Sequence, residues 1–183
     1  MPQPRSRKLE VLVKALAGFE AAPSLARIEE LLQGLELTRE DLEPFVVFNH
    51  GSKRYSRNIV AASGWYELLV VCWAPGQQSH IHDHSGSACA FRVIEGTGSE
   101  TTYLRAGGGL VRPVAAEILS RGDVCASHDA DIHRVANDTD DEDFITLHLY
   151  APALSLMNTY EAEPGAEEER RRLVARAVAS YSA

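Results

Sequence analysis

The sequence predicts an α+β fold that is mainly β, built as a small barrel with helices before it and one helix after it. Apolar residues recur at helical spacing in the first 45 residues. From about residue 55, short β-branched or aromatic runs alternate with turn residues. From about residue 165, acidic residues and then arginines form a helical pattern. We expect one domain over residues 1–183, with a helical cover at 1–45, a barrel at 55–152 and a closing helix at 165–183.

Three helices are expected in the N-terminal cover. Residues 7–17 place leucine and valine on one face. Ser24 can N-cap a second helix, because its hydroxyl can accept an unpaired backbone N–H of the first turn. Thr38, followed by Glu40 and Asp41, indicates a short third helix. These helices carry no recognisable chemistry, so we expect them to cover one surface of the barrel.

Strands are expected from about residue 66 onward. Each candidate is a short run rich in β-branched or aromatic residues and is bounded by turn residues. The glycines at 107–109 indicate a hairpin tip. A closing helix is expected to begin near Glu167. The eight candidate strands are residues 66–73, 90–95, 100–105, 110–114, 117–120, 124–127, 133–136 and 144–150.

Composition excludes several classes of protein. Hydrophobic residues make up 45% and charged residues 24%, the balance of an ordinary globular domain. A net charge of −8 without a basic run argues against nucleic acid or an anionic membrane as partner. No apolar run approaches the roughly 20 residues that span a bilayer. Three widely spaced cysteines suggest no disulfide framework, so we expect a cytoplasmic protein. A monomer is the simplest expectation, with higher oligomers left open.

The histidines are unevenly placed along the chain. His80, His82 and His84 alternate, which puts them on one face of an extended segment. Two imidazoles at this spacing can bind one metal ion, provided that a third ligand comes from elsewhere. A polar strand end with solvated histidines explains the alternation equally well.

Fixed glycines and histidines frame these residues in a first motif. Gly76 precedes His82 and His84, and Cys89 and Gly96 follow. The motif resembles the first motif of the cupin superfamily, in which a glutamate stands where this sequence has Cys89. The resemblance makes His82 and His84 metal ligands and leaves out His80.

A second motif follows in the expected order. Gly122, His128, Ala130, His133 and Asn137 keep the spacing of the second cupin motif, with His128 and Ala130 where proline and glycine are usual. The resemblance makes His133 the third ligand and His128 a structural residue. It implies a single cupin domain, a small jelly-roll-like β-barrel around the site.

The missing glutamate changes the chemistry of such a site. Cupins usually bind metal through three histidines and a carboxylate. Three neutral imidazoles alone would leave the cation its full positive charge, which favours thiolate over thiol in a bound substrate. Imidazole ligands suit Fe, Zn, Cu and Ni, so ligand type does not name the metal. Three protein ligands also leave room for a chelating substrate and O2.

Over about residues 55–152, roughly half its length, the sequence resembles the cysteine dioxygenases. The resemblance implies one Fe(II) per chain on His82, His84 and His133. It also implies a reaction, the oxidation of the thiol of L-cysteine to a sulfinate with both atoms of O2. The matching pieces are Tyr55-Ser56-Arg57-Asn58, Cys72-Trp73, Ile81-His82-Asp83-His84, Cys89, His133-Arg134-Val135 and Leu147-His148-Leu149-Tyr150.

The same resemblance assigns Arg57 to the substrate carboxylate, with Tyr55 beside it. A guanidinium is a planar and permanently charged fork that fits a carboxylate. An isolated arginine is more often part of a surface ion pair, so this role rests on the resemblance. Trp73, His148 and Met157 are expected to shape the wall of the cavity.

The last predicted strand places Thr146, His148 and Tyr150 on one face. A hydroxyl, an imidazole and a phenol in a row can orient the phenol, although an ordinary amphipathic strand would show the same pattern. The resemblance makes Tyr150 the active-site tyrosine and Thr146 the counterpart of a family serine. It also makes Cys89 the partner of Tyr150 in the family's thioether crosslink. A free cysteine is otherwise most often a small buried apolar residue.

Three alternatives stay open. A dioxygenase for 3-mercaptopropionate would tend to carry glutamine where this sequence has Arg57. A cupin with another metal would catalyse a different reaction, such as an isomerisation. A binding or sensor cupin with a vestigial site is disfavoured, because the three ligands, Arg57 and Tyr150 are all retained.

Overall fold

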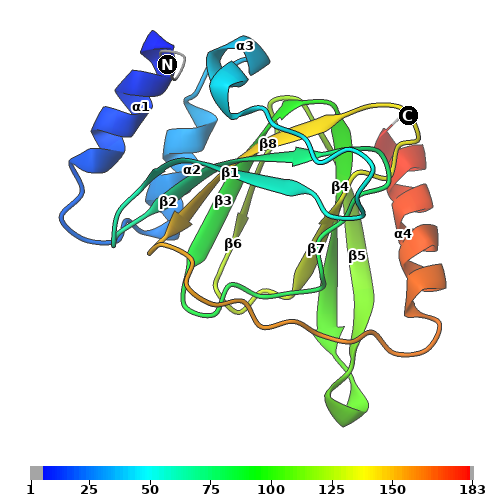
Figure 1. Ribbon diagram of the computed structural model, residues 1–183. Coiled ribbons are helices and arrows are strands. Elements are labelled where there is room, and N and C mark those ends of the chain that lie inside the picture. Colours follow the sequence, from blue (N-terminus) through cyan, green and yellow to red (C-terminus); the bar gives the residue numbers. More distant parts are fainter. Residues whose placement is uncertain (1–5, 182–183) are drawn as a thin grey trace.

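The computed structural model describes residues 6–181 (Figure 1). The N-terminal elements are α1 (Arg7–Ala17), α2 (Leu25–Gln33), α3 (Arg39–Leu42) and a 3-10 turn, η1 (Glu43–Phe45). The other helical elements are the 3-10 turn η2 (Gly107–Gly109) and the closing helix α4 (Ala166–Tyr181). The strands are β1 (Ser56–Ala62), β2 (Glu67–Trp73), β3 (Ala88–Glu95), β4 (Thr97–Arg105), β5 (Val111–Ser120), β6 (Val124–Ser127), β7 (His133–Ala136) and β8 (Phe144–Ala151).

The strands form two sheets, with the N-terminal helices outside one and α4 outside the other (Figure 1). The large sheet has the order β1-β2-β8-β3-β6 and the small sheet the order β5-β4-β7. Within the described residues they are separate sheets and not a closed barrel. The chain passes from one to the other at Gly96, between β3 and β4. Its φ is +78° and an added Cβ would collide with the carbonyl oxygen of Asp143, so the crossing requires glycine.

The predicted α+β, mainly β fold is confirmed, with two local differences in its strands. β1 lies where the sequence pattern predicts no strand, because Arg57 and Asn58 interrupt the apolar run. β5 is one strand where the pattern predicts two. Ala115 and Ala116 stay paired with β4 beside a register shift, so no turn forms between the two halves.

Alternation along β8 separates two faces of the large sheet. Ile145, Leu147 and Leu149 belong to the core that also contains the apolar faces of α1 and α2. Phe144 and Tyr150 belong to a second core on the opposite face. Every residue of β8 is buried. The polar groups on the second face must therefore find their hydrogen-bond partners inside the protein.

Ion pairs hold α4 against the small sheet. The Arg170 guanidinium lies 2.8 Å from Asp138 and 3.0 Å from Glu167. Arg134, on β7, also contacts Glu167 at 2.9 Å. The apolar cluster on this side of the molecule has four buried residues, Ile81, Tyr103, Val111 and Ile132. These ion pairs supplement the apolar contacts of the small sheet, whose Leu119 and Val135 also belong to the second core.

The N-terminal helices begin where the sequence predicts. Ser6 and Ser24 accept backbone N–H groups from Leu9 and Arg27, which caps α1 and α2. Asp41 accepts the backbone N–H of Thr38 at the start of α3. No helix within residues 6–181 is both long and apolar enough to cross a membrane.

Candidate metal centre and active site

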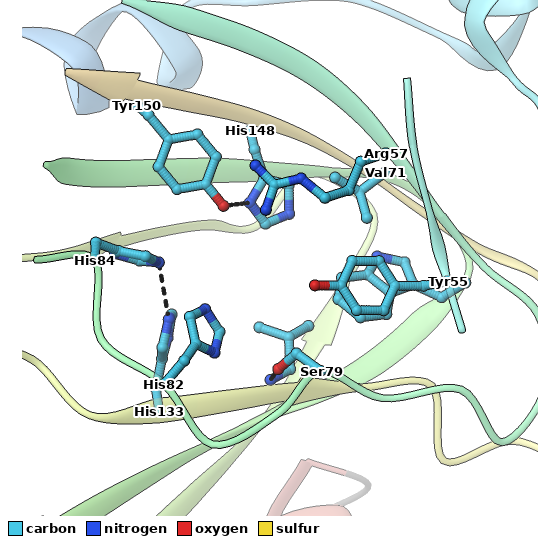
Figure 2. Close-up of a pocket in the computed structure, with 11 residues that line it drawn as sticks. Tyr55, Arg57, Val71, Ser79, His82, His84, His133, His148 and Tyr150 are labelled. Atoms are coloured by element: carbon cyan, nitrogen blue, oxygen red, sulfur yellow. Dashed lines mark hydrogen bonds between the residues drawn. The ribbon is translucent and has the colours of Figure 1, made fainter. Parts of the chain in front are cut away.

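A small, partly enclosed cavity contains the predicted site (Figure 2). Its walls come from β1, β2 and β8 of the large sheet, from β7 of the small sheet, and from the irregular segment between β2 and β3. Imidazole and aromatic side chains dominate the lining. The lining residues are Tyr55, Arg57, Val71, Trp73, Ser79, His82, His84, His133, Val135, His148 and Tyr150.

Three histidines meet at one end of this cavity. His82 and His84 come from the segment after β2, and His133 begins β7. One nitrogen of each lies within 4.8 Å of the others, and all three residues are buried. The Nε2 atoms of His84 and His133 are 3.2 Å apart (Figure 2). Within residues 6–181, no carboxylate or thiol belongs to this cluster.

Burial makes these imidazoles good metal donors. Desolvation, followed by the neighbouring His133, lowers the pKa of His82 to about 3 and that of His84 to about 2. Both rings are therefore neutral near pH 7 and offer lone pairs. Converging neutral imidazoles are ligands that divalent transition metals accept. The residues present thus fit a metal ion at this position.

Outer hydrogen bonds orient two of the three rings. The Nδ1 atom of His82 lies 2.9 Å from the carbonyl oxygen of His80, and that of His133 lies 2.5 Å from Oε1 of Glu100 on β4. Such contacts fix the tautomer that leaves Nε2 free for a metal. The Nδ1 atom of His84 is buried without a partner among the described residues. Glu100 is therefore part of the site as the hydrogen-bond partner of the His133 ring.

The backbone around the ligands is held by a later part of the chain. His82 and His133 exchange both backbone hydrogen bonds, at 3.0 and 2.9 Å. Residues 157–160, called the strap below, run beside the same segment and include Thr159, which forms a bridge with His82. The carboxylate of Asp83 is 5% exposed and accepts hydrogen bonds from the Asn158 amide and the Tyr160 hydroxyl. These bonds fasten the strap to the residue between two of the candidate ligands.

A chain of hydrogen bonds runs along the inner face of β8. Tyr150 Oη lies 3.4 Å from His148 Nδ1 (Figure 2), and His148 Nε2 lies 2.9 Å from Thr146 Oγ1. The Trp73 indole donates to the same hydroxyl at 3.0 Å. Burial raises the pKa of Tyr150 well above its ordinary value and lowers that of His148 well below its own. The phenol and the imidazole are therefore both neutral near pH 7.

Cys89 lies behind the cavity, next to Tyr150. The two residues are direct cross-strand partners on β3 and β8. The Cys89 thiol is 1% exposed and its Sγ atom is 3.9 Å from His148 Nδ1. Burial raises the pKa of this thiol, while a hydrogen bond with Tyr150 lowers it less strongly. Cys89 is thus a protonated thiol in the resting site.

Arg57 and Tyr55 stand on the wall opposite the small sheet. The Arg57 guanidinium lies 5.5 Å from the ring centroid of Tyr150, and its nearest carboxylate, Glu67, is 3.5 Å away. Met157 of the strap places its sulfur 3.9 Å from the same guanidinium. Tyr55 stacks on Trp73 with 4.2 Å between ring centroids. Figure 2 shows Arg57 and Tyr55 across the cavity from His84.

Comparison with known proteins identifies the family. The family model "Cysteine dioxygenase type I" matches residues 15–163 of this chain. The chain belongs to the cysteine dioxygenase type I family. It is 28% identical over 167 residues to cysteine dioxygenase type 1 of Danio rerio, which covers 86% of this chain and 81% of that protein. It is 25% identical over 170 residues to the Homo sapiens enzyme of the same name, which covers 90% of this chain and 82% of that one.

Solved structures support the fold of this cysteine dioxygenase relative. A Klebsiella pneumoniae protein with a double-stranded β-helix domain has a TM-score of 0.53 at 22% identity, over 66% of this chain and 88% of that one. TT1209 of Thermus thermophilus has a TM-score of 0.50 at 19% identity, over 65% of this chain and 99% of that one. The double-stranded β-helix is the arrangement expected of a cupin. The predicted cupin fold is therefore confirmed.

The residues predicted for the site all lie inside the range that matches the cysteine dioxygenase model. The structure places Cys89 and Thr146 one layer behind the cavity, where they contact residues of the lining. His80 and His128 are exposed and lie outside the histidine cluster. The other predicted residues line the cavity, namely Tyr55, Arg57, His82, His84, His133, His148 and Tyr150.

Sequence reasoning missed Glu100 and the Asp83–Asn158 contact. Glu100 alternates with buried residues along β4, so its sequence context is that of a solvent-facing strand residue. Asp83 lies within the expected motif, but its partner is 75 residues away. No spacing rule in a single sequence connects Glu100 with His133 or Asp83 with Asn158.

Proposed function

We propose that this chain is a cysteine dioxygenase with one Fe(II) on His82, His84 and His133. The observation that carries the proposal is the three-histidine cluster, without a carboxylate, beside the Tyr150–His148–Thr146 chain. The reaction converts the thiol of L-cysteine and O2 into cysteine sulfinate and a proton. Iron, when bound, would supply the redox chemistry that joins O2 to sulfur. The protein would supply positioning and electrostatics.

Arg57 is proposed to hold the substrate carboxylate, with Tyr55 beside it. The guanidinium lines the cavity and, among residues 6–181, meets one carboxylate, at the long distance of 3.5 Å. A substrate carboxylate can therefore compete for its free donors. The Tyr150 hydroxyl is proposed to donate a hydrogen bond to the reacting groups, since burial raises the pKa of the phenol and keeps it protonated. His148 and Thr146 would fix the direction of that hydroxyl.

A thioether between Cys89 and Tyr150 is also proposed. Their cross-strand register and the hydrogen bond between thiol and phenol bring the two side chains together. Forming the bond removes one hydrogen from sulfur and one from the ring, with O2 as the acceptor of the two electrons. A peptide map after many turnovers tests this, and only unmodified Cys89 and Tyr150 would refute it.

The decisive experiment uses the full chain loaded with iron under anaerobic conditions. L-cysteine and then O2 are added, and sulfinate is measured directly. The proposal predicts one sulfinate for each O2 consumed, with iron more effective than zinc, copper or nickel. A parallel assay with 3-mercaptopropionate decides between the two thiols. Equal activity with zinc, or O2 uptake without sulfinate, would refute the proposal.

A reducing, cytoplasmic location and a monomeric state are further parts of the proposal. All three cysteines, Cys72, Cys89 and Cys125, are free thiols. That state is normal in a reducing compartment. Sedimentation of the purified chain would test the monomer.

A further inference from the structure

A second, wider chamber opens outside the metal cavity and shares part of its wall. Tyr55, Arg57 and Ser79 line both spaces. The outer chamber is a wide concavity that is open to solvent. Ligands that enter or leave the inner cavity past these shared residues therefore pass through it. We call it the vestibule.

The charge of the vestibule is opposite to that of the whole chain. Four cationic residues line it, Lys53, Arg54, Arg57 and Arg134, and no acidic residue does. The whole chain has a net charge of −8. Arg57 and Arg134 have acidic partners, Glu67 and Glu167.

Lys53 and Arg54 are the cations of the vestibule that stay available. Both are exposed, and neither forms an ion pair with any residue in the range 6–181. Two unpaired cations beside a concave opening attract anions more strongly than the same charges on a flat surface. The vestibule can therefore bind an anion without first breaking an internal ion pair.

The loop that carries Lys53 and Arg54 is fixed by one buried side chain. The amide nitrogen of Gln77, a residue 2% exposed, donates to the carbonyl oxygens of Asn49, Ser52 and Arg54 at 3.1, 2.9 and 3.1 Å. Its oxygen accepts the backbone N–H of Ala74 at 2.8 Å. These bonds use the loop's backbone, so the cationic side chains can be changed without removing them.

The proposed reaction turns its substrate into a more negative product, which a cationic vestibule binds more strongly. L-cysteine carries one carboxylate and one ammonium group, and its thiol is mostly protonated at neutral pH. Conversion of thiol and O2 to sulfinate releases one proton. The product therefore carries one more negative charge than the substrate.

We propose that the vestibule is an anion-binding site for the sulfinate and carboxylate groups of small organic acids, and that it retains the anionic product on its way out. This inference rests on the proposed function for the identity of the product. The vestibule then distinguishes product from substrate, and L-cysteine sulfinate inhibits the enzyme through Lys53 and Arg54. The anion site itself depends only on the charges and the loop geometry.

The test compares the double variant Lys53→Gln/Arg54→Gln with Lys14→Gln/Arg112→Gln. Both variants lose two exposed cations, but Lys14 and Arg112 lie outside the vestibule. Exposed charge pairs are weak individually, so we expect the inhibition constant of L-cysteine sulfinate to rise on the order of fivefold in the first variant. It should stay unchanged in the second, and the KM for L-cysteine should change less than about twofold in both. A parallel rise of KM, or an equal effect in the second variant, overturns the proposal.

A direct binding measurement separates this inference from the proposed function. L-cysteine sulfinate is titrated calorimetrically into the iron-loaded full chain without O2, at low and high salt. Binding that weakens with salt and in Lys53→Gln/Arg54→Gln supports the vestibule, even if the chain proves unable to oxidise L-cysteine. Oxidation of L-cysteine without measurable sulfinate binding keeps the proposed function and overturns the vestibule.

Discussion

The two sheets contribute to the site by different physical means. The large sheet places Tyr150, His148 and Thr146 by the simple alternation of a central and fully buried strand. The three histidines lie on the side of the small sheet, His82 and His84 on irregular backbone and His133 at the start of a strand. Hydrogen bonds to groups outside the cluster must orient these rings. Regular register suffices for the first group. The second group depends on polar partners far away in the sequence.

The cores of the two sides differ in the same way. The large sheet is sandwiched between apolar cores that include α1 and α2 on one face. The small sheet shares the second core through Leu119 and Val135, adds a minor apolar cluster and forms ion pairs with α4. Perturbing polar contacts should therefore affect the metal side more than the tyrosine side.

Removal of one candidate ligand should give the largest effect. In His133→Ala we expect metal affinity to fall more than 100-fold, because loss of even an outer hydrogen-bond partner of a ligand costs about 10–100-fold. Metal content after dialysis against a chelator measures this. His80→Ala is the matched control, since His80 contacts the His82 ring through its backbone carbonyl, which alanine keeps. Equal metal loss in both variants would contradict the assigned ligands.

Arg57→Ala tests whether Arg57, on the large-sheet wall of the cavity, binds the substrate. We expect the KM for L-cysteine to rise about 10–100-fold, the equivalent of a lost charged hydrogen bond, with metal content unchanged. Steady-state kinetics and metal analysis on the same sample measure both quantities. Arg39→Ala, which removes an ion pair with Glu95 away from the cavity, should leave KM unchanged. Metal loss with an unchanged KM in Arg57→Ala would reject its role in substrate binding.

Glu100→Gln tests the outer contact on the small-sheet side. We expect metal affinity to fall roughly tenfold, because a neutral amide oxygen accepts the His133 N–H less strongly than the carboxylate does. Competition with a chelator measures the affinity. Glu117→Gln is the control, since Glu117 is exposed and faces Glu100 across the strand pair. An affinity equal to that of the parent chain would show that His133 needs no charged partner.

Thr146→Val tests whether the chain of hydrogen bonds on β8 orients the phenol. The hydroxyl lies between Trp73 and His148, so its loss leaves two buried groups without a partner. We expect kcat to fall about tenfold with metal content unchanged, and stability to fall by about 1–3 kcal/mol. Ile145→Val, on the opposite face of the strand, should lower stability by about 1 kcal/mol and leave kcat unchanged. An unchanged kcat in Thr146→Val would remove Thr146 from the site.

Acid should loosen the small sheet through Asp138. Burial raises the pKa of Asp138, but hydrogen bonds from Arg170 and Ser99 lower it overall below the ordinary value of 3.8. The stabilisation is therefore complete above the ordinary pKa and is lost as pH falls through the lower folded value. Because the pair is partly exposed, we expect Asp138→Asn to cost about 1 kcal/mol, or roughly 2–4 °C in Tm, at pH 7. Thermal scans should show this difference vanish in acid, and a constant difference would contradict the assignment.

The sequence was sufficient where a pattern is local. The predicted helix at residues 7–17 coincides with α1. Alternation along 144–150 correctly put Thr146, His148 and Tyr150 on one face. The resemblance to the two cupin motifs selected the three histidines that the structure brings together and left out His80. The first two inferences need only the period of a helix or a strand, and the third needs a motif known from a family.

The sequence was insufficient where the partner is remote or the signal is mixed. Glu100 and His133 are 33 residues apart and lie on neighbouring strands, a pairing that no periodicity reveals. β1 was missed because a strand that contributes an arginine to a cavity lacks the apolar pattern of a core strand. Separation into two sheets depends on which strands pair, and alternation shows only which way each residue faces.

The strap has a consequence for the order in which this protein is made. By the time Tyr150 has been synthesised, every candidate ligand and the tyrosine itself already exist in the nascent chain. Asp83, between two of the ligands, still lacks the hydrogen bonds that Asn158 and Tyr160 will provide. A ribosome must therefore translate about ten further codons, and release that stretch from its exit tunnel, before the metal centre can reach its final geometry.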